Sequence, residues 1–147
     1  MVGRAYALRH TYLEENMKLY EIFEMMKAKY FDAIVFIKSG KFYVVYDNDA
    51  IICNYLLHYK KVNGKVGFPE NALSHVLEVL KEKEVSYVIF EEQEQLFENN
   101  QYFQILKKAN ENQVVENMCY QLESIMKEKL LDNMDNFSKI RSFLVEL

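Results

Sequence analysis

The stretch that decides the fold is Phe36–Ala50, which reads FIKSGKFYVVYDNDA. Two apolar runs flank Ser39-Gly40, and glycine readily adopts the backbone angles that a tight turn needs. The second run ends at Asp47-Asn48-Asp49, and these side chains commonly cap the start of a helix. The stretch therefore predicts a β-hairpin, or two adjacent strands, that leads into a helix.

The segments around this hairpin alternate between helical and strand-like patterns. Apolar side chains recur at helical spacing in the predicted helices, and short apolar runs mark the predicted strands. We expect helices over 11–29, from 47 and from 68, and strands over 33–37, 41–46, 60–67 and 85–90. Residues 11–91 thus predict an α/β (α+β) domain with a mixed β-sheet of about four to six strands flanked by helices.

The composition changes after Glu91. Residues 92–147 contain no glycine, no proline and no strand pattern, so we predict a C-terminal helical extension of two or three helices. The expected breaks lie at Asn99-Asn100, Asn110 and Asp132-Asn133. Two arrangements are open: the helices complete the core of the sheet domain, or they form a separate surface for a partner.

Charge is distributed unevenly along the chain, whose net charge is −4. Residues 1–91 carry 12 basic and 12 acidic side chains, whereas residues 92–147 carry 6 and 10. A locally basic segment is compatible with phosphate contact, although scattered lysines are often only a solvated surface. The basic segment is 38–65, and its lysines are Lys38, Lys41, Lys60, Lys61 and Lys65.

The motifs of common enzyme classes are missing, so we predict a protein without catalytic residues. Gly64-Lys65 is followed by Val66, and no glycine stands five residues before Gly64, which excludes the phosphate-binding loop of nucleotide hydrolases. No lysine has an acidic residue two positions before it, as a common nuclease motif requires. The histidines and cysteines show no ligand spacing, so we expect neither a metal nor a cofactor.

Cysteine usage and hydropathy indicate the compartment. Cys53 and Cys119 both fall in apolar helical patterns, where buried free thiols of a cytoplasmic protein are expected. Residues 1–10 are too short and too polar for a secretory signal, and no apolar run approaches the ~18 residues of a membrane span. We therefore expect a cytoplasmic location and no membrane contact.

Four motifs follow one another within residues 18–91. They are a helix that ends at Met26–Tyr30, a strand of the type D-x-I-V-F-x-K-x-G-x-F-Y at Asp32–Tyr43, Tyr46-x-x-Asp49-Ala50, and Gly67-Phe68-Pro69 before an amphipathic helix. In this order they resemble the N-terminal, mismatch-recognition domain (domain I) of MutS-type DNA mismatch repair proteins. The resemblance implies a mixed α/β unit that contacts double-stranded DNA through its hairpin region.

The resemblance also implies a binding site. In that family a Phe-x-Glu motif enters the minor groove, where the Phe wedges against the mispaired base and the Glu hydrogen-bonds it. The matching residues here are Phe42 and Val44, so the Phe is present and the Glu is replaced. The implied nucleic-acid-binding residues are Phe42, Lys41, Lys38, Lys60, Lys61 and Lys65, with Arg4 and Arg9 as a basic N-terminal arm.

The Val44 replacement can be weighed physically. Phe42 and Val44 point to the same face of a strand, and stacking on a base contributes ~1–3 kcal/mol whatever the base. Val44 offers no hydrogen-bond acceptor, so we expect weak or absent mismatch selectivity. Ordinary core packing of Phe42 in an apolar strand is the competing interpretation.

Two functions follow from these observations. The leading one is a stand-alone or accessory DNA-binding module related to DNA repair, because no segment matches the connector, lever, clamp and ATPase domains of the family. The alternative is an adaptor or oligomerisation protein without DNA binding, with a protein partner or a homodimer through residues 92–147. Methionines suit an adaptable partner surface, and the extension carries Met118, Met126 and Met134.

Overall fold

The computed structural model describes residues 18–147. The start of the helix predicted over 11–29, and Arg4 and Arg9, lie outside the described residues. The chain divides into two compact units, Met1–Ala109 and Asn110–Leu147, each of which is described by itself below.

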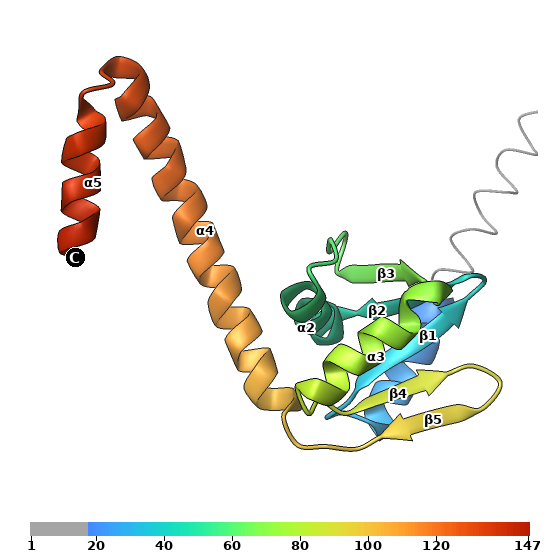
Figure 1. Cartoon of the computed structure of the whole chain (residues 1–147). Coiled ribbons are helices and arrows are strands. Elements are labelled where there is room, and N and C mark those ends of the chain that lie inside the picture. The colour runs from blue at the N-terminus through green and yellow to red at the C-terminus, as the bar shows by residue number, and fades with distance from the viewer. Residues whose placement is uncertain (1–17) are drawn as a thin grey trace, which may run out of the picture. The chain divides into compact units, whose positions relative to one another are not determined.

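Five strands of the first unit form one mixed sheet (Figure 1) in the order β3-β2-β1-β4-β5. β1 and β4 are parallel, and the other neighbouring strands are antiparallel. The strands are β1 (Ile34–Ser39), β2 (Phe42–Tyr46), β3 (Lys65–Pro69), β4 (Tyr87–Phe90) and β5 (Glu94–Phe97). The mixed α/β architecture with five strands confirms the predicted fold class.

Helices cover both faces of this sheet. α2 and α3 lie in front of it in Figure 1, and the N-terminal helix, described over residues 18–29, lies behind it. The other helices are α2 (Asp47–Leu57), a 3₁₀ turn (Glu70–Ala72), α3 (Leu73–Glu82), α4 (Tyr102–Asp132) and α5 (Asn136–Glu146). The larger core, which includes Phe36, Val45, Phe68 and Leu80, lies under α2 and α3. A smaller core with Phe23, Val35 and Val88 lies under the N-terminal helix.

The predicted hairpin is confirmed. Ser39 pairs with Phe42, so the loop consists of Gly40 and Lys41, and Gly40 has a φ of +60°. Asn63 and Gly64, with φ values of 51° and 76°, form a second tight turn between Val62 and Lys65, directly before β3, which pairs antiparallel with β2. The predicted interior strand is β4, which lies between β1 and β5.

Several expectations were wrong. Residues 92–147 do contain a strand, β5, a short and largely exposed strand at the sheet edge whose two polar and two apolar residues show no apolar alternation. Asn110 does not break a helix but lies inside α4. Cys119 is exposed, whereas Cys53 is buried as predicted. The Asp47–Asp49 side chains do not cap α2, for which no side-chain cap hydrogen bond exists.

The second unit is a helical hairpin, residues 110–147. It consists of α4 from Asn110 onward and α5, joined by a short turn. The Asn136 side chain donates a hydrogen bond of 2.9 Å to the Lys129 carbonyl across this turn. None of the described helices combines the length and the hydropathy that crossing a membrane requires.

Candidate nucleic-acid interface

Phe42 is an exposed aromatic residue at the tip of a rigid hairpin. Its side chain follows the Gly40-Lys41 loop, and 53% of its surface is exposed. Tyr43 and Val45, its neighbours on the opposite face of β2, are buried in the larger core. The interpretation of Phe42 as a core residue was therefore wrong, and an exposed ring is what stacking on a base requires.

The sheet surface beside Phe42 carries little side-chain bulk where β3 runs. Phe42 lies opposite Pro69, and Val44 lies opposite Gly67, in the antiparallel register of β2 and β3. Gly67 contributes no side chain, and a Cβ placed on it meets nothing closer than the Tyr43 carbonyl oxygen at 3.8 Å. We name Phe42, Val44, Lys65, Gly67 and Pro69 the β2–β3 face. It leaves room for a flat ligand to approach Phe42 from the sheet edge.

Val44, which by the motif resemblance corresponds to the Glu of the family motif, takes part in packing. It is partly buried and packs against the smaller core under the N-terminal helix. Its neighbour on β1 is Ile37, which is buried. Val44 therefore fills an apolar position on the same face as Phe42 and presents no polar group to a ligand.

The five candidate lysines fall into two groups. Lys38 and Lys41 lie at the Phe42 end of β2, because Lys41 belongs to the hairpin loop and Lys38 pairs with Tyr43. Lys65 pairs with Tyr46 at the other end, about 14 Å away along a strand that rises ~3.4 Å per residue. Lys60 and Lys61 precede the turn that leads into β3, so they belong to the second group. The structure thus does not gather all five lysines around Phe42.

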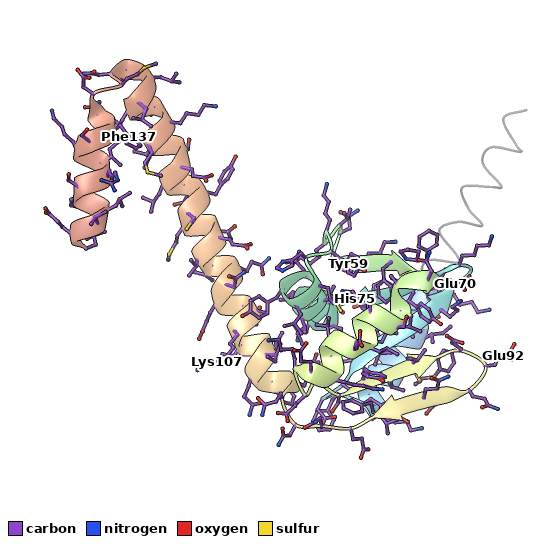
Figure 2. The ribbon with its side chains drawn as sticks, in the orientation of Figure 1. Tyr59, Glu70, His75, Glu92, Lys107 and Phe137 are labelled. Atoms are coloured by element: carbon purple, nitrogen blue, oxygen red, sulfur yellow. The ribbon has the colours of Figure 1, made fainter. Side chains whose placement is uncertain are left out.

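The Lys38 side chain interacts with neighbouring side chains on the face of the sheet that is opposite to the β2–β3 face. Its ammonium forms an ion pair with Glu70 and lies 4.5 Å from the centre of the Tyr43 ring. Glu70, which follows β3, is labelled in Figure 2. The Tyr43 hydroxyl in turn donates to the Glu91 carboxylate. Part of the positive charge of Lys38 is therefore neutralised within the protein.

A groove of about 570 Å³ opens where the N-terminal helix meets β1 and the β4–β5 turn. Its lining mixes apolar side chains such as Leu19 and Ile37 with one basic residue, Lys38, and two acidic ones, Glu91 and Glu92. Carboxylates repel phosphate oxygens, so this groove is unsuited to a nucleic-acid backbone. Lys65 on β3, and Lys60 and Lys61 before the turn that leads into it, lie by contrast on the β3 side of Phe42, away from this groove.

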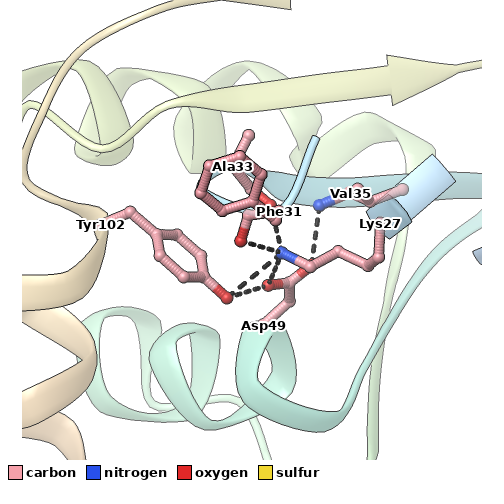
Figure 3. A network of polar contacts seen from close by, with 6 residues as sticks. All are labelled: Lys27, Phe31, Ala33, Val35, Asp49 and Tyr102. Atoms are coloured by element: carbon pink, nitrogen blue, oxygen red, sulfur yellow. Dashed lines mark hydrogen bonds and ion pairs between the residues drawn. The ribbon is translucent and has the colours of Figure 1, made fainter. Parts of the chain in front are cut away.

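Sequence reasoning missed a buried polar network that holds the hairpin in place (Figure 3). Asp49, which is fully buried, accepts hydrogen bonds from the Val35 amide at 2.9 Å and from the Tyr102 hydroxyl at 2.6 Å. The Lys27 ammonium lies 3.0 Å from the same carboxylate and 2.6 Å from the Ala33 carbonyl oxygen. The network joins the N-terminal helix, β1, α2 and α4, which are far apart in the sequence.

Burial governs the electrostatics of this network. It raises the pKa of the Asp49 carboxyl, while the Lys27 charge and the hydrogen bonds from Tyr102 and Val35 counteract part of this effect. Burial next to Asp49 likewise raises the pKa of the Tyr102 hydroxyl. An ion pair that is buried and fully hydrogen-bonded is a structural element, and its signal in the sequence was the Tyr46-x-x-Asp49-Ala50 motif.

Comparison with known proteins agrees with this geometry. The sequence model of MutS domain I matches residues 17–119, which is more than two thirds of the chain. The match includes the hairpin with Phe42, the Asp49 network and the start of α4. A search among curated proteins found no match. Sequence and fold together show that the chain belongs to the MutS domain I family.

Proposed function

We propose that this protein binds double-stranded DNA through its β2–β3 face. The observation that carries the proposal is the exposure of Phe42, which by the motif resemblance corresponds to the wedge phenylalanine of the Phe-x-Glu motif. Side chains of this type insert between base steps from the minor groove and kink the duplex. Lysines of both groups then serve as contacts to the phosphates on either side of the inserted ring.

The scaffold suits a wedge, because an inserted side chain must stay in position while base pairs unstack. Phe42 lies between a glycine turn and a strand whose next residue, Tyr43, is buried. The Tyr43 ring stacks on Phe68 with centroids 5.9 Å apart, and this contact links β2 to β3 through the core. The backbone that carries Phe42 is therefore fixed by packing on the opposite face of the sheet.

The β2–β3 face lacks a hydrogen-bond acceptor that could recognise the edge of a base. Val44 has no acceptor, so the energy of binding comes from stacking and phosphate contacts, which are nearly independent of sequence. A mismatched or unpaired site is easier to unstack, and this property alone supports only a small preference for it. We therefore propose a DNA-binding module with weak or absent mismatch selectivity.

Fluorescence anisotropy with labelled DNA tests the proposal. The full chain is titrated against a perfect duplex, a duplex with one mismatch and a single strand, each at low and at physiological salt. Phe42→Ala is compared with Phe103→Ala, because Phe103 has the same exposed fraction of 53% and lies on α4. We expect weaker duplex binding for Phe42→Ala alone, by roughly tenfold, since stacking contributes ~1–3 kcal/mol per base.

Two results would contradict the proposal. Equal losses for Phe42→Ala and Phe103→Ala would show that the hairpin tip has no special role. An absence of duplex binding by the wild type even at low salt would exclude DNA as the ligand. In that case the adaptor function through residues 110–147 becomes the better proposal, because both helices of that unit expose large apolar side chains.

A further inference from the structure

The helical hairpin, residues 110–147, has no interior of its own. Every one of its residues is described, and none of their side chains is buried. Met126, Leu130 and Ile140, at the contact between the two helices, are only partly buried. Two isolated helices that bury so little gain too little from packing to offset the entropy of ordering them. The hairpin therefore requires a further surface that covers it.

One face of the hairpin has the pattern of a helix-packing seam. Val115, Met118, Leu122 and Ile125 recur along α4 at spacings of three, four and three, the pattern of coiled-coil core positions. Phe137, Ile140 and Leu144 on α5, followed by Leu147 directly after it, repeat this pattern, and Phe137 is labelled in Figure 2. The two helices thus present the seams that a four-helix bundle brings together.

An apolar groove of about 590 Å³ between α4 and α5 is lined by two residues of each seam, Leu122 and Ile125 on α4 and Ile140 and Leu144 on α5. Leu122 and Ile125 line it from α4, and Ile140 and Phe143 line it from α5. Together with Val115 and Met118, these four residues are named the bundle face. Glu123 and Lys139, which also line the groove, place one charge of each sign beside it.

We infer that the bundle face binds the bundle face of a second copy of this chain, so that two hairpins form a four-helix bundle. The exposed apolar area of the hairpin is large enough for such an interface. Seven apolar side chains of the two seams and the groove have exposed fractions between 46% and 87%, namely Val115, Met118, Leu122, Ile125, Phe143, Leu144 and Leu147. Their exposed surface is on the order of 800 Å², the amount that each partner contributes to a standard protein interface.

The charged residues beside the groove also favour a second copy of this chain as the partner. A two-fold dimer is self-complementary, because each contact between residues i and j occurs twice. When α4 of one copy lies against α5 of the other, Glu123 meets the opposite charge of Lys139 in the second copy, and the reverse contact forms as well. The inference concerns self-association and is independent of DNA binding by Phe42, so either can fail without the other.

Sedimentation velocity of the full chain over a range of concentrations tests the inference. We expect a concentration-dependent shift from monomer to dimer, and loss of the dimer in Leu122→Glu and Phe143→Glu. Both side chains are exposed, so the sheet unit remains folded, and the inaccessibility of the buried Cys53 to a thiol reagent reports its integrity. A wild type that stays monomeric at every concentration overturns the inference.

A charge exchange separates contacts between copies from contacts within one chain. In Glu123→Lys, the introduced ammonium of each copy faces Lys139 of the other, and in Lys139→Glu two acidic side chains face each other. We expect each variant alone to dimerise more weakly than the wild type and an equimolar mixture to recover the dimer. Pairing within one hairpin predicts no gain on mixing, and that result contradicts the proposed arrangement.

Cys119 gives an independent readout at the same groove, which it lines. Its thiol is exposed in the single chain, so a thiol reagent modifies it readily in the monomer. If the bundle forms, the rate of modification falls as the protein concentration rises. A rate that is the same at all concentrations, with a dimer present in sedimentation, places the interface elsewhere and overturns the proposed one.

Discussion

The Tyr102 hydroxyl donates a hydrogen bond of 2.6 Å to the Asp49 carboxylate, which joins residues 53 positions apart in the chain. Tyr102 is the first residue of α4, and Asp49 lies in the first turn of α2, directly after the strand that carries Phe42. The start of α4 therefore belongs to the sheet unit. The support of the candidate site comes from residues of four elements, so we expect changes far from Phe42 to affect it.

The first prediction concerns Lys27, which compensates the buried charge of Asp49. Lys27→Met leaves the carboxylate without its ion-pair partner, and breaking a buried pair costs about 3 kcal/mol or more of unfolding free energy. Lys29→Met is the matched control, because Lys29 pairs with Glu94 at the exposed surface. Urea unfolding measures the unfolding free energy of both variants. Similar stabilities for the two variants would contradict the structural role given to Asp49.

The second prediction restores the missing acceptor of the family motif. Val44→Glu places a carboxylate beside Phe42, and a hydrogen bond to a charged group contributes ~1.5–3 kcal/mol. We expect the preference for a mismatched over a perfect duplex to rise roughly tenfold, at some cost in stability because Val44 is partly buried. Val44→Leu serves as the control without an acceptor. An unchanged preference in a folded Val44→Glu protein would show that the face does not reach the bases.

The third prediction uses the open surface at Gly67. Its backbone is not in the left-handed region, and a Cβ there meets only ordinary contacts, so Gly67→Leu folds normally. The new side chain lies beside Val44 and obstructs the approach to Phe42. We expect duplex affinity to fall by as much as it does in Phe42→Ala, while the thermal unfolding temperature stays close to that of the wild type. Undiminished affinity would exclude the β2–β3 face as the binding surface.

The fourth prediction separates the lysines by their effect on salt dependence. Each phosphate contact adds about 0.9 to the slope of log affinity against log salt. Lys41→Gln and Lys65→Gln should each lower this slope by about that amount, whereas Lys83→Gln, at the end of α3 on the opposite face, should not. Lys38→Gln should lower it less, because Glu70 already neutralises part of the Lys38 charge. Equal slopes for all four variants would leave the assignment of phosphate contacts without support.

The fifth prediction follows from the buried thiol of Cys53. Burial, with the nearby Asp49 charge, raises the pKa of Cys53, so the folded protein keeps this proton at a pH where the unfolded chain has lost it. Unfolding free energy should therefore decrease as the pH rises above ~8.5, by up to about 1.4 kcal/mol per pH unit. Cys53→Ala should remove this decrease between pH 8.5 and about 10. If the unfolding free energy of Cys53→Ala still decreases with pH in this range, groups other than Cys53 cause the decrease.

The hairpin and the interior strands could be predicted from the sequence because their signals are local. Gly40 marks the turn, and the apolar runs before and after it demand burial. β5 could not be predicted, since an exposed edge strand needs no apolar alternation. The family resemblance rested on short motifs in a fixed order, and the match to MutS domain I confirms it.

The site was predicted less completely than the fold. Phe42 was identified through the family motif, yet local patterns could not decide whether its ring is buried, because that depends on what lies opposite in β3. The five lysines were treated as one segment, although the register of β2 and β3 separates them into two ends of a strand. Asp49 was read as a helix cap because its partners Lys27 and Tyr102 come from distant parts of the chain.

Pro69 has a consequence for how copies of this chain can meet. β3 is an edge strand, and open edges can pair with strands of other molecules and start aggregates. Pro69 has no amide hydrogen to donate, the strand is only five residues long, and Lys65 places a charge at its other end. The β3 edge, which lies next to the exposed Phe42, is thus protected against growth into fibrils. Self-association through the proposed bundle face would therefore not compete with strand pairing at this edge.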